Sequence, residues 1–171
     1  MELSTYESAL QNYFSGLNIA KSPISFWDIY GSFLDSLKGT FSDINILQDI
    51  AKINKWKMNW NIEKELHDDT VIVVTDVNLK IVFASENIIE MNGYKPTEVV
   101  GNHPKMFQGQ DTEIETSNYI GNAIKKQVPF DKIVTNYRKD GSLYKCHIKG
   151  FPVFDTKGNL KNFIAFEKTA A

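Results

Sequence analysis

Three strand-like segments in close succession near the C-terminus constrain the fold of this chain more than any other feature. They read FDKIVTNYR, SLYKCHIKGFPVF and NLKNFIAFEK, and short turns at residues 139–141 and 155–158 connect them. Each turn contains a glycine, which can adopt the positive φ that tight hairpin turns require. Apolar and polar side chains alternate along the segments, so the pattern predicts consecutive strands of one sheet.

A hairpin and two helices are predicted before these strands. Two short β-rich runs, TVIVVTD and LKIVFAS, make residues 70–84 a hairpin. The segment ENIIEMNGY predicts a short helix that ends at Gly93, and EIETSNYIGNAIKKQ predicts a longer one. The predicted order is therefore β-β-α-α-β-β-β. The expected buried side of the longer helix consists of Ile114, Tyr119, Ile120, Ala123 and Ile124.

Residues 1–66 show a helical pattern instead. Apolar residues recur there at three- and four-residue spacing. One helix is expected to begin near Ser22, which is followed by proline, and a third helix is expected to end near Trp56. We therefore expect an N-terminal helical segment, residues 1–66, that serves packing or dimerisation, and a second domain over residues 67–171.

Composition excludes several classes of function. The 171 residues are 42% apolar, with a formal net charge of −2 and a pI near 5.9. A chain without a basic surplus is not expected to bind nucleic acid. The single cysteine, Cys146, rules out an intrachain disulfide and a multi-cysteine metal site. There is no signal-like N-terminus and no apolar run of about 20 residues, so we expect a cytoplasmic protein without a membrane partner.

Two stretches of the second domain resemble the PAS family. They are VVTDVNLKIVFASENIIEMNGYKPTEVVG and NYRKDGSLYKCHIKGFPVFDTKGNLKNFIAFEKT. The resemblance implies an α+β PAS fold, in which short helices lie over the concave face of a five-stranded antiparallel sheet, preceded here by the N-terminal helical segment. It also implies a pocket on the concave face and a sensory or interaction role. We expect no enzyme, since the chain has no G-x-S-x-G, P-loop or H-E-x-x-H motif.

Within the family, GNHPKMFQGQDTE resembles the flavin-binding LOV photosensor branch, which carries Gly-Arg-Asn-Cys-Arg-Phe-Leu-Gln-Gly there. The photoactive cysteine of that branch falls on Pro104. Proline has no thiol, so the resemblance implies a LOV-like domain that cannot form the flavin–cysteinyl adduct. The branch's phosphate-binding arginines fall on Lys105 and Gly121, and its asparagine before the cysteine falls on His103. Gln108 is retained.

The flavin-ring contacts of the branch are changed as well. One ring-binding asparagine is kept as Asn136, the other becomes Cys146, and the signal-relaying glutamine becomes Glu167. Strand alternation and the family frame place these three on the pocket side. The cofactor stays unknown, with neither flavin nor haem expected. Our candidate pocket-lining residues are His103, Lys105, Gln108, Asn136, Cys146 and Glu167.

Three of the candidates have alternative interpretations. Glu167, a carboxylate in an apolar pocket, either reads a ligand or proton, or pairs with Lys105 or Asn136. His103 is interpreted as a loop histidine rather than a haem ligand. Cys146 is interpreted as a small apolar filler rather than a redox sensor. The three scattered histidines do not have the spacing of a metal site.

The opposite face of the predicted sheet is also apolar in part, through Ile133, Tyr137, Leu143, Ile164 and Phe166. So much apolar surface is not normally left in water. We expect the N-terminal helices to cover it, within one chain or between two, and we expect a homodimer.

The leading hypothesis is a stand-alone PAS signalling module that binds an unknown small molecule or a signalling protein partner. The alternative is a ligand-free protein–protein interaction module with a filled core. The volume left by inward-facing Tyr144, Phe163 and Met106 distinguishes the two.

Overall fold

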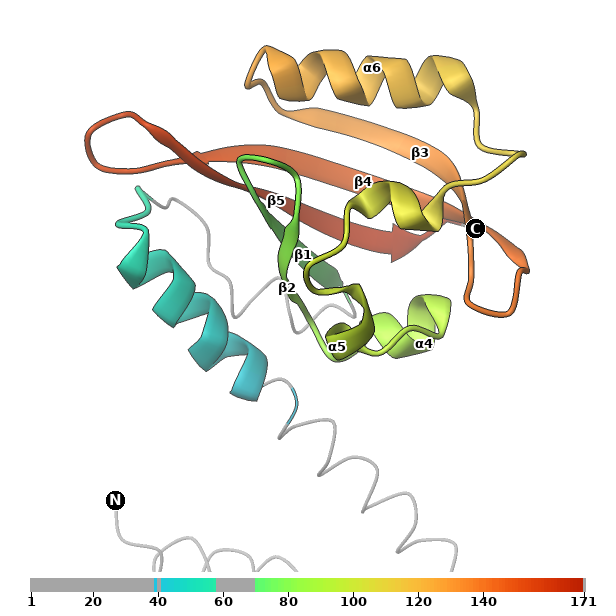
Figure 1. The fold of residues 1–171 in the computed structure, drawn as a ribbon, viewed down its shortest axis with the longest axis horizontal. Helices are drawn as coiled ribbons and strands as arrows, with labels where there is room; N and C mark the ends of the chain where they lie inside the picture. The colour runs from blue at the N-terminus through green and yellow to red at the C-terminus, as the bar shows by residue number, and fades with distance from the viewer. Residues whose placement is uncertain (1–38, 40, 58–69, 171) are drawn as a thin grey trace, which may run out of the picture. The chain divides into compact units, whose positions relative to one another are not determined.

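The computed structural model describes residue 39, residues 41–57 and residues 70–170. Five strands form one antiparallel sheet in the order β2-β1-β5-β4-β3 (Figure 1). The α+β PAS fold expected from the sequence is confirmed, whereas the helices expected before residue 39 lie outside the described residues. The strands are β1 (Val71–Asp76), β2 (Ile81–Ala84), β3 (Phe130–Tyr137), β4 (Leu143–Phe154) and β5 (Leu160–Thr169).

Turns with the expected chemistry connect neighbouring strands. Gly141 and Gly158 have φ angles of 85° and 84°, so the turns between β3 and β4 and between β4 and β5 need glycine there. In the turn between β1 and β2, the Asp76 carboxylate accepts hydrogen bonds from the backbone N–H groups of Asn78 and Lys80, each at 2.8 Å. The predicted hairpin of β1 and β2 is confirmed.

Four helical segments lie between β2 and β3, where the sequence predicted two. They are α4 (Ile88–Asn92), α5 (Pro96–Val99), the 3₁₀ helix η2 (Pro104–Phe107) and α6 (Ile114–Lys125). Gly93 ends α4 with a φ of 79°, as expected. The two missed helices have four residues each, too few to show a helical period, and only their initial prolines signal them.

The predicted buried side of α6 is partly wrong. Ile114 and Tyr119 are 77% and 49% exposed, although Ala123 is buried. The row of α6 that faces inward is Ser117, Ile120, Gly121 and Ile124, at the i, i+3, i+4, i+7 spacing of one helix face. Because this row lies over a cavity, α6 buries less apolar surface than a helix on a packed core.

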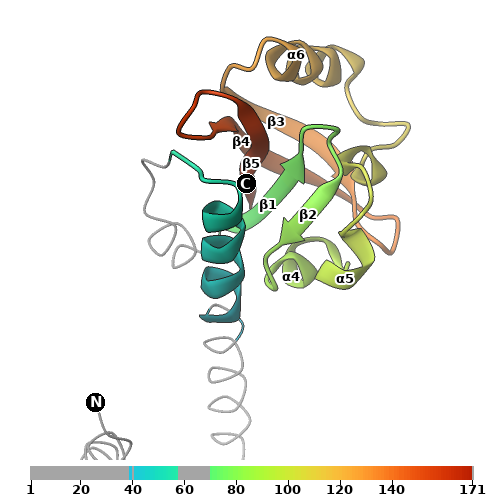
Figure 2. The ribbon, with the colours of Figure 1, turned by 60° about the vertical axis from the view of Figure 1, so that its left-hand side comes forward.

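A helix over residues 41–53, here named the cover helix, packs against the outer face of the sheet (Figure 1). Figure 2 shows it on one side of the sheet, with α4 and α5 on the other. Leu47 is its fully buried centre. The buried cluster under the cover helix consists of Leu47, Trp56, Ile72, Val74, Phe83, Val153, Ile164 and Phe166.

Hydrogen bonds attach the segment of residues 41–57 to the rest of the domain near both of its ends. The Trp56 indole donates to Asn162 Oδ1 at 2.8 Å, and the Asn162 amide donates to the Thr75 carbonyl at 3.0 Å. Near the other end, the backbone N–H of Glu86 donates to the Asp43 carboxylate at 2.9 Å. The expectation that N-terminal residues cover the outer face is confirmed within one chain for residues 41–57. The domain boundary between residues 66 and 67 stays a prediction.

Among the described residues, part of the outer face beyond the cover helix is exposed. Ile133 on β3 and Leu143 on β4 are 52% and 48% exposed, in contrast to buried Ile164 and Phe166 on β5. His147, also on this face, pairs with Asp131, so the surface role expected for it is consistent with its position. Among the helices of the described residues, none has the length and apolarity to cross a membrane.

Candidate functional site

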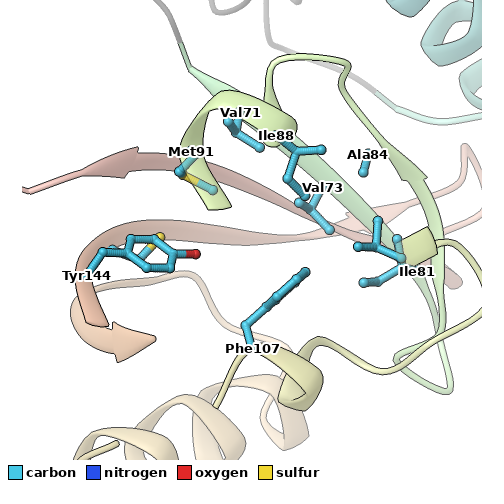
Figure 3. Close-up of a cluster of buried hydrophobic side chains, with 10 residues drawn as sticks. Val71, Val73, Ile81, Ala84, Ile88, Met91, Phe107 and Tyr144 are labelled. Carbon is cyan, nitrogen blue, oxygen red and sulfur yellow. The ribbon is translucent and has the colours of Figure 1, made fainter. Parts of the chain in front are cut away.

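The concave face of the sheet contains a cavity of about 410 Å³. The part of this face below α4 and α5 is filled by a buried apolar cluster, in which Tyr144 of β4 and Phe107 of η2 point toward the side chains of β1 (Figure 3). The cavity lies beside this cluster, between the sheet and the pair η2 and α6. Its apolar lining includes Val73, Phe107, Ile120, Ile124, Phe130, Ile148, Phe163 and Ala165.

A glycine on β4 shapes one wall. Gly150 pairs with Phe130 of β3, and the Phe130 ring occupies the space that a Cβ at position 150 would need. The ring can lie flat on the strand only because residue 150 has no side chain. At Gly121 on α6, by contrast, there is open space, since a Cβ added there would meet no atom within 4 Å. The cavity is therefore open below α6.

The loop residues singled out in the sequence lie at the mouth of the cavity. His103, Pro104, Lys105 and Gln108 all line it. His103 Nδ1 accepts a hydrogen bond from the Lys105 backbone N–H at 3.1 Å, which places the histidine at the N-cap of η2. Partial burial, together with the Lys105 charge, lowers the pKa of His103. His103 is thus a hydrogen-bonded loop residue in this structure.

Two of the three strand residues singled out in the sequence, Asn136 and Glu167, line the cavity at its floor, whereas Cys146 does not line the cavity and belongs to the packed apolar cluster beside it. Glu167 is buried on β5 and lines the cavity together with Asn136 of β3. The Cys146 thiol of β4 donates to Glu167 Oε2 at 3.6 Å. Burial raises the pKa of Glu167 to about 7, against the smaller lowering effect of this hydrogen bond. Burial and the Glu167 carboxylate also raise the pKa of Cys146.

The expected partners of Glu167 are corrected by this geometry. The sequence suggested Lys105 or Asn136, but among the described residues the hydrogen-bond partner of the carboxylate is Cys146. Lys105 is exposed at the mouth, whereas Glu167 is buried on the floor. Strand alternation together with the family resemblance placed the carboxylate on the pocket side, but neither supplied the cross-strand distance to the thiol.

Several buried polar atoms near the floor have no hydrogen-bond partner in the described part of the chain. They are Thr75 Oγ1, Asn92 Nδ2, Asn136 Oδ1 and the Tyr144 hydroxyl. The Tyr144 hydroxyl faces the Asn136 and Asn92 amides without forming a hydrogen bond of ordinary geometry with either. Sequence analysis missed Thr75, which lines the cavity. Alternation along β1, which puts Thr75 on the same face as Val71 and Val73, was the available signal.

The two other histidines are not among the described residues that line this site. His147 lies on the outer face, and His67 lies outside the described residues. Within residues 41–57 and 70–170, no group of three or more His, Cys, Asp or Glu side chains is arranged to hold a metal ion.

Comparisons with curated proteins show relatives with much longer chains. Phototropin-2 of Oryza sativa subsp. japonica is 32% identical over 114 residues, which cover 62% of this chain and 13% of the relative. Protein TWIN LOV 1 of Arabidopsis thaliana is 36% identical over 88 residues, 51% of this chain and 22% of the relative. The bacterioopsin transcriptional activator of Halobacterium salinarum is 28% identical over 98 residues, which cover 57% of this chain and 14% of the relative. This chain therefore spans less than a quarter of the length of these relatives.

Solved structures and a family model agree with these relatives. The light-state and dark-state structures of the blue-light photoreceptor Aureochrome1 LOV have TM-scores of 0.58 and 0.61 and identities of 28% and 27%. The light-state match covers 63% of this chain and 88% of the photoreceptor chain, and the dark-state match covers 67% and 86%, respectively. The PAS domain model matches residues 68–168, which is more than half of the chain. The chain therefore belongs to the PAS domain family.

Proposed function

We propose that this chain is a PAS sensory module that binds a small organic molecule in its concave cavity and has no light-driven thiol chemistry. The observation that carries the proposal is the cavity of about 410 Å³. It is lined by Thr75 and Asn136, whose buried side-chain oxygens have no hydrogen-bond partner among the described residues.

Size and polarity both favour a ligand over a filled core. Small-molecule pockets typically measure about 300–1,000 Å³ and combine apolar walls with a few placed polar groups. An unsatisfied buried polar group costs about 1–3 kcal/mol, which a bound molecule with complementary groups would offset. Of the residues that were expected to fill the space, Tyr144 and Met106 belong to the packed cluster and Phe163 forms a wall.

Two observations support the absence of adduct chemistry. Pro104 lines the cavity at the position that the LOV-like motif assigns to the photoactive cysteine. Cys146, the single cysteine of the chain, is buried, and its raised pKa keeps the thiol neutral. A neutral thiol is a poor nucleophile because the thiolate is the reactive form.

The residues present do not fit flavin mononucleotide well. Gly121 leaves open space where the LOV branch has its second phosphate-binding arginine, so Lys105 is the remaining cation of that pair. Glu167 puts a buried carboxylate where the branch has a glutamine amide. An amide can donate a hydrogen bond at neutral pH, whereas an ionised carboxylate can only accept one.

The second candidate function is a protein–protein interaction module. Ile133 and Leu143 are exposed apolar residues on the uncovered outer face, and such residues favour contact with a signalling partner or a second copy. Homodimerisation through this face is part of our proposal, and it is compatible with ligand binding on the opposite face.

Extraction of the purified protein tests ligand binding. The full chain is unfolded in acid and the released molecules are identified by mass spectrometry, after an absorption spectrum has been recorded for flavin or haem. Ala165→Phe fills the cavity from β5 and should abolish both the released molecule and the binding of 8-anilinonaphthalene-1-sulfonate. Ile133→Phe, on the exposed outer face, is the control and should behave as wild type. A wild-type protein that releases no stoichiometric molecule and binds no dye would support the ligand-free alternative.

A further inference from the structure

We infer that the cavity takes a planar base whose edge carries adjacent N–H donors, of the guanine or amidine kind, with an anionic group facing the cavity mouth. The inference rests on the proposed ligand-binding function and specifies the class of ligand. It follows from how acceptors and cations are distributed in the cavity.

The buried end of the cavity presents oxygen acceptors. Glu167, Asn136 and Thr75 come from three different strands, are all buried and all line the cavity. Asn136 Oδ1 and Thr75 Oγ1 have no partner among the described residues, and Glu167 receives the weak thiol donor of Cys146. A carboxylate has about four lone-pair sites, so most of its accepting capacity faces the cavity. No lysine or arginine of the described residues forms an ion pair with Glu167.

The shape of a carboxylate favours two parallel donors. A group with adjacent N–H bonds can reach both oxygens at once, as arginine does in bidentate pairs, whereas a single donor reaches one. Guanine carries such an edge in its ring N–H and neighbouring amino group. Apolar walls from Val73, Ile148 and Phe163 provide the surfaces against which a planar ring can lie.

The mouth has the opposite character. Lys105 of η2 and Lys125 of α6 line the cavity and are exposed, and neither forms an ion pair with a carboxylate of the described residues. A molecule whose donor edge lies on the floor would place an anionic substituent near these lysines. A flavin ring placed as in the LOV branch would instead present acceptor atoms to position 167. In that branch the protein side chain donates and the ligand accepts, whereas here Glu167 would accept and the ligand would donate.

The pH dependence of binding should distinguish donor ligands from acceptor ligands. Burial raises the pKa of Glu167 to about 7. A donor edge binds the ionised carboxylate, so its affinity should increase from pH 6 to pH 8, whereas an acceptor edge needs the protonated form. Other groups facing Glu167 are Cys146 and Tyr144, whose raised pKa values keep them neutral. At the mouth, Lys105 and Lys125 carry positive charge, and His103 has a lowered pKa.

Calorimetric titration of the full chain provides the test. The probes are guanosine monophosphate and inosine monophosphate, which differ only in the amino group, with flavin mononucleotide as the acceptor-edge comparator. We expect the guanosine nucleotide to bind about ten-fold more tightly than the inosine nucleotide, since a hydrogen bond to a charged group is worth at least this factor. Glu167→Gln should remove this preference and the carboxylate-dependent increase with pH. Phosphate ionisation affects wild type and Glu167→Gln alike, so it cancels when the two proteins are compared. His147→Gln, on the outer face and away from the cavity, should retain the wild-type pattern.

The outcomes separate the inference from the function on which it rests. Equal binding of the two nucleotides, or tighter binding of flavin mononucleotide, overturns the inference. Binding of 8-anilinonaphthalene-1-sulfonate without binding of either nucleotide also overturns it, while ligand binding by the cavity stands. If none of the probes binds and no molecule is released from purified protein, both the inference and the proposed function fail.

Discussion

The Cys146 thiol on β4 lies 3.6 Å from Glu167 Oε2 on β5, and this contact joins two buried ionisable groups on the concave face. Burial raises the pKa of both groups. The thiol stays neutral and donates, whereas the carboxylate changes its charge near neutral pH because its pKa is about 7. Within the described part of the chain, the charge of the cavity floor therefore depends on the protonation of Glu167.

Glu167 should make the protein less stable as pH rises from about 4.5 to 7. The folded protein keeps this proton up to a pKa of about 7, whereas the unfolded chain releases it near 4.5. The free energy of unfolding should therefore fall across this interval, by up to about 3 kcal/mol, and level off above it. Urea unfolding at pH 5, 6, 7 and 8 measures the slope. Glu167→Gln should flatten it, and a mutant that kept the full slope would contradict this assignment.

Asp43 should add a slope of the same sign at lower pH. Burial raises its pKa from 3.8 to about 6, so its stabilising contribution is full below 3.8 and is lost as pH rises through 6. Asp43→Asn should remove the part of the slope below pH 6 and leave the part that belongs to Glu167. Unfolding of the double mutant measures whether the two contributions add, as expected for separate sites.

Trp56→Phe should destabilise the protein by about 1–3 kcal/mol, because it leaves Asn162 Oδ1 buried without its donor. A double-mutant cycle with Asn162→Ala isolates the hydrogen bond from the loss of ring volume. Urea unfolding of the four proteins should give a favourable coupling energy between Trp56 and Asn162, which means that the two substitutions together cost less than the sum of their separate costs. Strict additivity would show that the 2.8 Å contact contributes no net stability.

Two neighbouring residues of the cover helix offer a matched comparison of packing. Leu47 is fully buried against the sheet, whereas Ile46 is 44% exposed on the same helix. Leu47→Ala should cost about 2–5 kcal/mol, the range for a large core side chain, while Ile46→Ala should cost well under half of that. Equal costs in chemical denaturation would mean that the helix does not stabilise the fold through this face.

The homodimer should depend on the uncovered strip and not on the cover helix. Leu143→Asp puts a charge on the exposed outer face and should shift a dimer to the 19.5 kDa monomer in light scattering. Phe166 lies under the cover helix, so Phe166→Asp should lower the unfolding midpoint and should not by itself change the molecular mass of the folded protein in solution. Wild-type protein that is monomeric at high concentration would refute the dimer.

The regular parts of the fold could be predicted from the sequence because their signals are local. Alternation along SLYKCHIKG placed Cys146 and Tyr144 on one face, and Gly141 and Gly158 marked turns that need positive φ. The face of α6 was partly misassigned, because Tyr119 is apolar enough to fit a buried stripe but packs with Lys132 at the surface.

The sequence predicted which residues line the candidate site better than it predicted which residues they contact. Strand period showed which side chains share a face, and the resemblance to the PAS family implied that the face of Glu167 and Asn136 is the pocket side. Both residues line the cavity. The partner of Glu167 did not follow, because the separation between β4 and β5 side chains depends on sheet twist and cross-strand register. Alternation along β1 puts Thr75 on the pocket side with Val71 and Val73, but the alternation does not show that its hydroxyl is buried without a partner among the described residues, which depends on the assembled sheet.

The alternation of β5 limits the kinds of motion by which this domain can transmit a signal. Glu167 faces the cavity, and the preceding residue, Phe166, packs under the cover helix. If β5 slid by one residue, the phenyl ring would enter the cavity and the carboxylate would enter the apolar cluster, since a one-residue slip exchanges the two faces of a strand. A one-residue slide of β5 is therefore strongly disfavoured, whereas a tilt or a sideways displacement of the whole strand keeps both side chains on their own faces.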